Sequence, residues 1–192
     1  MFYAISVKKL ILPAAAVLGV LLAGCGTAYV LWRYPTAHLE QVNRYAGAYG
    51  LSPSFALAVI HAESKFDRQA TSSKGASGLM QIRQGTADWL AGDLQIEGYD
   101  YSRIYEPEIN IRLGCYYLSK LYKQFGGSLE LTLAAYNAGE GNVAKWLLDK
   151  RCSDDGKTLK YIPFKETRVY ISRVKTNMRI YNLLLKLKGI EQ

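Results

Sequence analysis

The stretch from residue 52 to residue 90 constrains the fold of this chain most, because it places a capped apolar helix directly before an irregular segment of small residues. Ser52 followed by Pro53 is typical of a helix start, since the serine side chain caps a free backbone N–H group and proline lacks the N–H that the first turn leaves unpaired. On the predicted helix, Glu63 shares one face with three apolar residues, which are Ala56, Val59 and Ile60.

Glu63 therefore lies on or beside an apolar stripe, near the end of its helix. Burial there removes water from the carboxyl group and disfavours its charged form, so the side chain can stay protonated near neutral pH and donate a proton. The alternative is a glutamate at the rim of the core whose carboxylate reaches water, as long charged side chains commonly do.

The segment 71–81 follows this helix and contains two glycines, Gly75 and Gly78. Glycine tolerates backbone angles that other residues avoid and lets a ligand or another backbone approach closely. An apolar pair and an amide come next, namely Leu79, Met80 and Gln81. A plain linker would not need the apolar pair, so we interpret the segment as one wall of a cleft.

Four motifs follow one another along the chain: Glu63-Ser64, GASGLMQI at 75–82, AAYNAGEGNV at 134–143 and ETRVYI at 166–171. Together they resemble the lytic transglycosylases of the soluble-transglycosylase (SLT) family, over roughly residues 36–185. The resemblance implies a mostly α, lysozyme-like single globular domain. One departure is Gln84, where the family usually has a proline; we expect it to alter a turn rather than the chemistry.

The resemblance also implies a chemistry with one catalytic residue, Glu63. It would protonate the oxygen that links N-acetylmuramic acid to N-acetylglucosamine in peptidoglycan, and then, as a carboxylate, deprotonate the muramoyl C6 hydroxyl to leave a 1,6-anhydro ring. Such a double role requires a pKa near the working pH. The residues expected to contact the substrate are Ser64, Ser77, Met80, Gln81, Tyr136, Asn137 and Tyr170.

Some of these roles have structural alternatives. Asn137 either binds the ligand or is locked to backbone, because a buried amide without a partner is costly. Tyr170 either reaches Glu63 or is a core tyrosine. Ser64 either orients the carboxyl group or binds the sugar. Glu166 is expected to favour the start of the last helix through the helix dipole.

Two other functions remain as alternatives. A muramidase that hydrolyses the same bond needs a second carboxylate, and the candidates Asp67, Asp88 and Asp93 have no special context. A weakly catalytic wall-binding module of a secretion, division or sporulation machine need not keep the acid.

Composition excludes several other classes. The formal net charge is +8, which suits anionic partners such as lipid or a wall polymer. No zinc-finger spacing or RNA-binding aromatic motif occurs, so we expect no nucleic-acid partner. The sequence has no HExxH motif, no GxSxG elbow and no phosphate-binding glycine loop. We therefore expect no metal and no cofactor.

The amino-terminal segment 1–35 is predicted to be a membrane anchor or signal. Residues 10–32 carry no charge, and these 23 residues are enough to cross a hydrocarbon core of about 30 Å. The alternatives are a cleaved signal peptide and a lipoprotein lipidated at Cys25, because Leu22 to Cys25 resembles a lipobox. Each places the remaining chain, residues 36–192, on the extracytoplasmic side.

Within 36–192, capping residues and glycines predict a series of helices. Thr36 is expected to cap the first, Gly85 or Thr86 to open one that contains Trp89, and Gly141 or Asn142 to open one that ends at Leu148. Longer helices are expected from Pro107 to Gly126, from 129 to 138 and from 165 to 188. Two points remain open. Tyr99, Tyr101 and Tyr105 either line a sugar groove or fill a small core, and Cys115 and Cys152 either form a disulfide or stay free.

Overall fold

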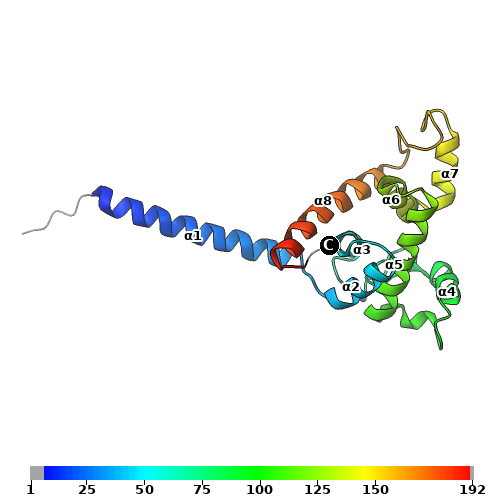
Figure 1. Cartoon of the computed structure of the whole chain (residues 1–192), viewed down its shortest axis with the longest axis horizontal. Coiled ribbons are helices and arrows are strands. Elements are labelled where there is room, and N and C mark those ends of the chain that lie inside the picture. The colour runs from blue at the N-terminus through cyan, green and yellow to red at the C-terminus, as the bar shows by residue number, and fades with distance from the viewer. Residues whose placement is uncertain (1–6, 191–192) are drawn as a thin grey trace, which may run out of the picture. The chain divides into compact units, whose positions relative to one another are not determined.

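The computed structural model describes the backbone of residues 7–190 and the side chains of residues 19–22 and 24–190. The chain divides into two compact units, Met1–Pro35 and Thr36–Gln192. The first unit contains helix α1, Val7–Arg33 (Figure 1). Residues 10–18 of the predicted membrane span lie outside the described side chains. Among the described residues, no helix combines the length and apolar character that a membrane span requires.

The second unit is mostly helical, as predicted, and has one small antiparallel hairpin (Figure 1). Its elements are α2 (Leu39–Ala48), α3 (Pro53–Glu63), β1 (Ala76–Ser77), β2 (Ile82–Arg83), α4 (Gln84–Asp93), the 3₁₀ helix η1 (Tyr101–Tyr105), α5 (Pro107–Gln124), α6 (Leu129–Ala138), α7 (Glu140–Leu148) and α8 (Lys165–Leu187).

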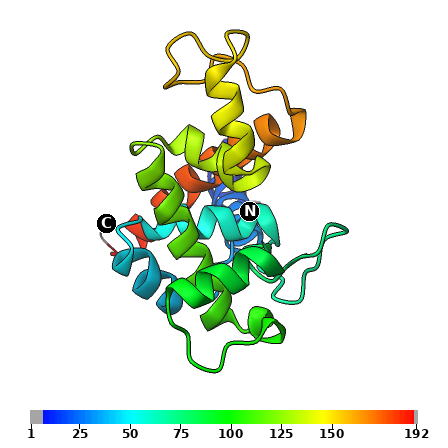
Figure 2. The same cartoon turned by 90° about the vertical axis from the view of Figure 1, so that its right-hand side faces the viewer.

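Helix α3 is the centre of this unit. Ser52 caps it as predicted, since its Oγ accepts a hydrogen bond from the Phe55 backbone N–H at 3.3 Å. Every residue from Ser54 to His61 is buried, which is typical of a helix that is apolar on all sides. Helices α2 and α8 pack against it, and Figure 2 shows α3, in cyan, crossing the middle of the domain. The helix therefore holds Glu63, its last residue, in a fixed place.

The predicted bounds of α5, α6 and α8 agree with the structure to within two residues. Pro107 stands at the start of α5, where its missing N–H costs nothing. Ser128 caps α6 by accepting a hydrogen bond from the Leu131 N–H at 3.3 Å. Gly139 ends α6 with a φ of 89°, a conformation that favours glycine.

Three predicted helix starts are wrong by one or two residues. Thr36 does not cap α2; His38 occupies the N-cap position in the left-handed region, with a φ of 59° and no side-chain cap. Helix α4 begins at Gln84 because Arg83 passes directly from an extended conformation into the helix. Helix α7 begins at Glu140, since Gly139 makes the whole turn between α6 and α7.

Cys115 and Cys152 do not form a disulfide in the structure: both are free and buried. Cys115 belongs to the buried face of α5, where burial raises the pKa of its thiol to about 12. Cys152 lies in the loop between α7 and α8, and its carbonyl oxygen accepts hydrogen bonds from the N–H groups of Lys160 and Tyr161. The two free cysteines thus belong to different elements of the fold.

Candidate active site

Two cavities of the second unit meet at Glu63. One has a volume of about 420 Å³ and lies against the segment after α3, α4 and the end of α6. The other has a volume of about 460 Å³ and lies along the first two turns of α8. Both cavities are lined by Glu63, Asn137 and Glu166. A polymer bound across this junction would therefore have room on either side of Glu63.

The carboxyl group of Glu63 is poised to exchange a proton at neutral pH. Burial raises its pKa from 4.5 to about 7, because a charged carboxylate is poorly solvated at this depth. The Tyr170 hydroxyl and the Arg173 guanidinium lower the pKa in part, whereas the negative charge of Glu166 adds to the rise. Both protonation states are therefore populated near pH 7, which suits a group that acts first as an acid and then as a base.

Two tyrosines lie close to this carboxyl group. The Tyr136 hydroxyl donates a hydrogen bond to the Met80 carbonyl oxygen at 2.7 Å, so it joins α6 to the segment after α3. The Tyr170 hydroxyl is buried and reaches no partner within hydrogen-bonding geometry. It nevertheless lies near enough to Glu63 to oppose the rise in the carboxyl pKa. Burial and the nearby Glu63 raise the pKa of both tyrosines well above 10, so both hydroxyls keep their protons.

The end of α3 is fixed to the opposing wall by Ser64. Its Oγ donates a hydrogen bond to the Leu79 carbonyl oxygen at 2.8 Å and accepts one from the Phe66 N–H at 3.1 Å. Ser64 therefore positions the Glu63 backbone, and it lines neither cavity. Lys65 and Phe66, with φ of 54° and 70°, and Gln81, with φ of 49°, adopt left-handed conformations beside the site. Such backbone strain is frequent at functional sites.

The wall itself is the hairpin of β1 and β2, which projects to one side in Figure 2. Asn110 of α5 holds it from below: its Nδ2 donates to the carbonyl oxygens of Ser77 at 3.1 Å and Ile104 at 2.9 Å, and its Oδ1 accepts from the Met80 N–H at 2.7 Å. Gly78 lies against this amide, and a Cβ at Gly78 would come within 2.1 Å of Asn110 Nδ2.

Not all the predicted contact residues reach a cavity. Gln81, Tyr136, Asn137 and Tyr170 line the cavities that meet at Glu63. Ser77 and Met80 do not: they belong to the hairpin, but their side chains are buried, with exposed fractions of 2% and 0%. The prediction that they line the cleft is corrected accordingly. Their carbonyl oxygens accept hydrogen bonds, from Asn110 and Tyr136 respectively, so they support the wall.

Two amides at the site have part of their hydrogen-bonding capacity used by the protein. The Nε2 of Gln81 donates to the carbonyl oxygens of Ala70 at 3.0 Å and Gly78 at 2.9 Å. The Oδ1 of Asn137 accepts a hydrogen bond from the Thr167 hydroxyl at 2.7 Å. Gln81 is thus left with an acceptor and Asn137 with a donor toward the cavity. The group that holds the Asn137 amide is therefore the Thr167 side chain and not the backbone.

Several residues that line the cavities are not among the predicted contacts, and Glu166 and Tyr117 are two of them. Glu166 was expected only to favour the start of α8, yet it lines both cavities. Tyr117 of α5 lines the cavity on the hairpin side of the cleft, and its ring centre is 5.4 Å from that of Tyr136. The position of Glu166 in the ETRVYI motif was an available signal; Tyr117 had none. Conversely, the hydroxyls of Tyr101 and Tyr105 hydrogen-bond to the wall segment instead of facing a cavity.

No group of three or more histidine, cysteine, aspartate or glutamate residues that could hold a metal ion occurs among the described residues.

Comparison with known proteins identifies the family. The family model described as "Transglycosylase SLT domain" matches residues 40–158. The soluble lytic murein transglycosylase of Escherichia coli K12 is 38% identical over 144 residues, which cover 74% of this chain and 22% of that protein. A membrane-bound lytic murein transglycosylase C of Edwardsiella ictaluri is 29% identical over 169 residues, covering 75% of this chain and 46% of that protein.

The fold is shared with a solved structure. An inactive mutant of lytic transglycosylase Slt from Pseudomonas aeruginosa superposes with a TM-score of 0.73 and 36% sequence identity, over 85% of this chain and 26% of that one. The predicted mostly helical, lysozyme-like fold is confirmed by this agreement. The chain spans less than a third of the length of the soluble relative and of the solved structure.

Proposed function

This chain belongs to the transglycosylase SLT family, and on that basis we propose that it is a peptidoglycan lytic transglycosylase. It cleaves the β-1,4 bond between N-acetylmuramic acid and N-acetylglucosamine and leaves a 1,6-anhydro end. The observation that carries the proposal is the place of Glu63, a carboxyl group with a pKa of about 7 where two cavities meet.

In the first step, protonated Glu63 donates its proton to the glycosidic oxygen as the bond to C1 breaks. Positive charge develops at C1, and the acetamide carbonyl of the substrate itself is available to stabilise it. In the second step, the Glu63 carboxylate takes the proton from the muramoyl C6 hydroxyl, whose oxygen attacks C1. Glu63 ends the cycle protonated, so no water is consumed and one residue performs both transfers.

The neighbouring residues support this sequence of steps. Because Thr167 occupies the Oδ1 of Asn137, that side chain offers its Nδ2 donors to a substrate carbonyl such as an acetamide. The unpaired Tyr170 hydroxyl stabilises the Glu63 carboxylate that forms between the two steps. The bond from Ser64 to the wall keeps the end of α3 still while the charge on Glu63 changes.

One observation favours hydrolysis as a second candidate. Glu166 lines both cavities together with Glu63, so a second carboxylate is present that was not among the candidates Asp67, Asp88 and Asp93. A hydrolase of this kind uses the second carboxylate as a base that activates water, or as a nucleophile. Glu166 is exposed in the first turn of α8. It could therefore bind a substrate amine or hydroxyl without taking part in catalysis.

The products distinguish the two chemistries. We expect purified peptidoglycan digested by the full chain to yield 1,6-anhydromuramoyl ends, which mass spectrometry detects as lighter by one water than hydrolysed ends. Glu63→Gln should lower turnover by about 10³-fold and leave wall binding intact. Glu166→Gln should still give anhydro products. Reducing ends from the unmodified chain that disappear in Glu166→Gln would establish a muramidase.

Binding to the wall without any cleavage would favour a wall-binding module. Unchanged turnover in Glu63→Gln would refute the assignment of the catalytic residue.

We also propose that the first unit anchors the protein to a membrane, with the second unit on the extracytoplasmic side. The uncharged run 10–32 after Lys8 and Lys9 supports this proposal. A relative named as membrane-bound shares 29% identity with this chain. Lipidation at Cys25, which is exposed in α1, is the alternative mode of attachment.

A further inference from the structure

We propose that α8 carries a second binding site on the side away from Glu63, which holds the acidic stem peptides of an uncleaved glycan strand. The proposal rests on the proposed function, because it takes peptidoglycan as the substrate. It concerns a separate cavity of about 380 Å³, between α8, the start of α6 and the segment 159–162.

The two sites use different faces of α8. The residues of α8 at the Glu63 cleft include Glu166, Tyr170 and Arg173. Those at the second cavity, which we name the rear groove, include Arg168, Lys175 and Arg179. At 100° per residue, the three named cleft residues and the three named groove residues lie on nearly opposite sides of the helix, about 170° apart on average. A ligand in the rear groove therefore does not compete for the cleft.

The rear groove carries an excess of positive charge. Four cations line it, Lys160, Arg168, Lys175 and Arg179, against one carboxylate, Glu130. Lys175 pairs with Glu130 at 2.6 Å, and Lys160 pairs with Asp154 of the neighbouring loop. Within the described part of the chain, neither Arg168 nor Arg179 forms an ion pair with a carboxylate. Two arginines are thus available to an anionic ligand.

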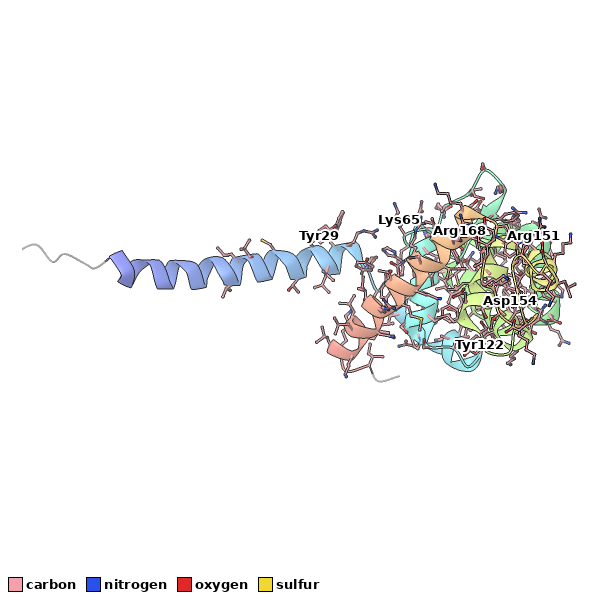
Figure 3. All side chains as sticks on the ribbon, turned by 90° about the horizontal axis from the view of Figure 1, so that it is seen from above. Tyr29, Lys65, Tyr122, Arg151, Asp154 and Arg168 are labelled. Carbon is pink, nitrogen blue, oxygen red and sulfur yellow. The ribbon has the colours of Figure 1, made fainter. Side chains whose placement is uncertain are left out.

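Arg168 is held ready for such a ligand. Its Nη1 donates hydrogen bonds to the carbonyl oxygens of Ile162 and Pro163, and its guanidinium lies 5.5 Å from the centre of the Tyr161 ring. Figure 3 labels Arg168 on α8 and Asp154 in the loop that precedes the helix. Because the guanidinium is already oriented by neutral groups, its positive charge is uncompensated and little side-chain entropy is lost when it binds a carboxylate.

The arrangement of the charges favours an extended polyanion. Arg168 and Arg179 are eleven residues apart on one helix, so the cations follow a line of about 16 Å. A single small anion cannot contact the whole line, whereas an extended chain with carboxylates at intervals can. In a cross-linked wall, the strand beside the one being cut presents carboxylates repeatedly through its peptides. The rear groove would hold that strand and keep the enzyme on the wall.

The first test measures binding of the full chain, carrying Glu63→Gln so that the wall is not consumed, to purified sacculi in a pelleting assay. The groove variant is Arg179→Glu with Ser172→Glu, both exposed on α8. The control variant is Lys123→Glu with Gln124→Glu, both exposed at the end of α5, which changes the net charge equally. We expect the groove variant to bind about tenfold more weakly and the control to bind normally, at matched melting temperatures. Equal binding by the two variants would overturn the proposal.

Two further probes identify the anion. On sacculi whose peptide carboxylates have been amidated, the protein with an unmodified groove should bind as weakly as the groove variant. If the groove variant still binds amidated sacculi more weakly than the protein with an unmodified groove, another anion such as a wall phosphodiester occupies the groove, and the peptide assignment is wrong. If the groove variant loses binding to phosphatidylglycerol vesicles but binds sacculi normally, the groove binds a lipid headgroup and the proposal is overturned.

A third measurement separates this inference from the proposed function. With Glu63 present, the groove and control variants should cleave short peptide-free glycan strands at equal rates, because those strands carry no peptide carboxylates. The groove variant alone should be slower on intact sacculi. If no protein releases anhydro products from either substrate, the proposed function fails, and the binding assays still decide whether the groove binds peptide.

Discussion

Glu63 takes its chemical character from its position as the last residue of a buried helix. The pattern of apolar residues before it and the motif that contains it were both visible in the sequence, so its candidacy could be predicted. The pKa of about 7 could not, because it depends on burial by segments that are distant in sequence. Tyr170, Arg173 and Glu166 all come from α8, more than 100 residues further along the chain.

A consequence of this pKa is a stability that falls with pH. Because the pKa of Glu63 is raised from 4.5 to about 7 by folding, the folded state binds the proton more tightly than the unfolded state. The associated stability is complete below pH 4.5 and is lost as the pH rises through about 7. We expect Glu63→Gln, which has no proton to lose, to gain up to about 3 kcal/mol in unfolding free energy relative to the unmodified chain between pH 4 and pH 8.

Urea unfolding at several pH values measures this difference directly. Tyr170→Phe is a useful companion, because loss of its hydroxyl removes a contribution that lowers the pKa of Glu63 and should move the midpoint of the pH dependence upward. A difference between Glu63→Gln and the unmodified chain that does not change with pH would show that Glu63 has an ordinary pKa.

For single residues, the sequence motifs located the site correctly but did not predict the role of every side chain in it. Met80 belongs to the GASGLMQI motif, but its side chain packs into the core next to Gly114, where a Cβ would come within 2.2 Å of its sulfur. A motif can thus mark a residue for its packing or its backbone contacts. The direction of each side chain depends on the φ of 80° at Gly78 and of 49° at Gln81, which no sequence period encodes.

At the scale of elements, the wall after α3 depends on α5 for its shape. The Asn110 amide holds the hairpin through two hydrogen bonds, to Ser77 and Met80, and makes a third to the Ile104 carbonyl oxygen of η1. This residue is completely buried, and an unsatisfied amide in its place would cost about 1–3 kcal/mol. The wall is therefore an extension of the core, although it has few regular hydrogen bonds of its own.

Substitution of the two glycines of the wall distinguishes the cost of backbone strain from the cost of steric crowding. Gly75 and Gly78 have nearly equal φ, 75° and 80°, but a Cβ at Gly75 meets open space whereas one at Gly78 meets Asn110 and the Ile104 carbonyl oxygen. We expect Gly75→Ala to lose about 1 kcal/mol of stability from the left-handed backbone. Gly78→Ala should lose roughly 2 kcal/mol more and most of its activity, because the wall must move away from α5.

Urea unfolding and turnover on peptidoglycan, measured for both variants, test this expectation. Equal effects of the two substitutions would mean that the wall can shift away from α5 without cost.

Most helices of this domain were predictable, because their caps and stops are local. The Ser52, Ser128 and Gly139 positions each satisfy a chemical need of a helix end that can be recognised in the sequence. The starts of α2 and α4 were not predictable, since the helices begin where neighbouring segments direct the backbone. Tyr101 and Tyr105 illustrate the same limit: both were open between a sugar groove and a core, and only the folded hairpin shows their hydrogen bonds.

At the scale of the whole molecule, the chain consists of two units with distinct compositions. The uncharged run is confined to the first unit, and the motifs to the second. The mostly helical, lysozyme-like fold could be predicted from four motifs in order. The meeting of α3, α6 and α8 at one cleft could not be derived from periodicity, because it joins segments separated by about a hundred residues.

A fusion of residues 1–35 to a reporter tests the proposed role of the first unit. We expect the fusion to be found in the membrane fraction, and to stay there when Cys25 is replaced by alanine, because the uncharged run rather than a lipid would hold it. Fractionation and alkaline extraction measure the outcome. Release of the Cys25→Ala fusion would favour a lipoprotein, and release of both fusions would refute membrane attachment by this segment.

The junction of two cavities at Glu63 has a consequence for what happens after the bond is broken. If the cut falls at the junction, each half of the polymer occupies its own cavity, and the two halves no longer depend on each other for their hold on the protein. The half that dissociates more slowly can slide by one repeat and present a new bond to Glu63. The relative residence times in the two cavities would then determine whether the enzyme moves along one strand or leaves after a single cut.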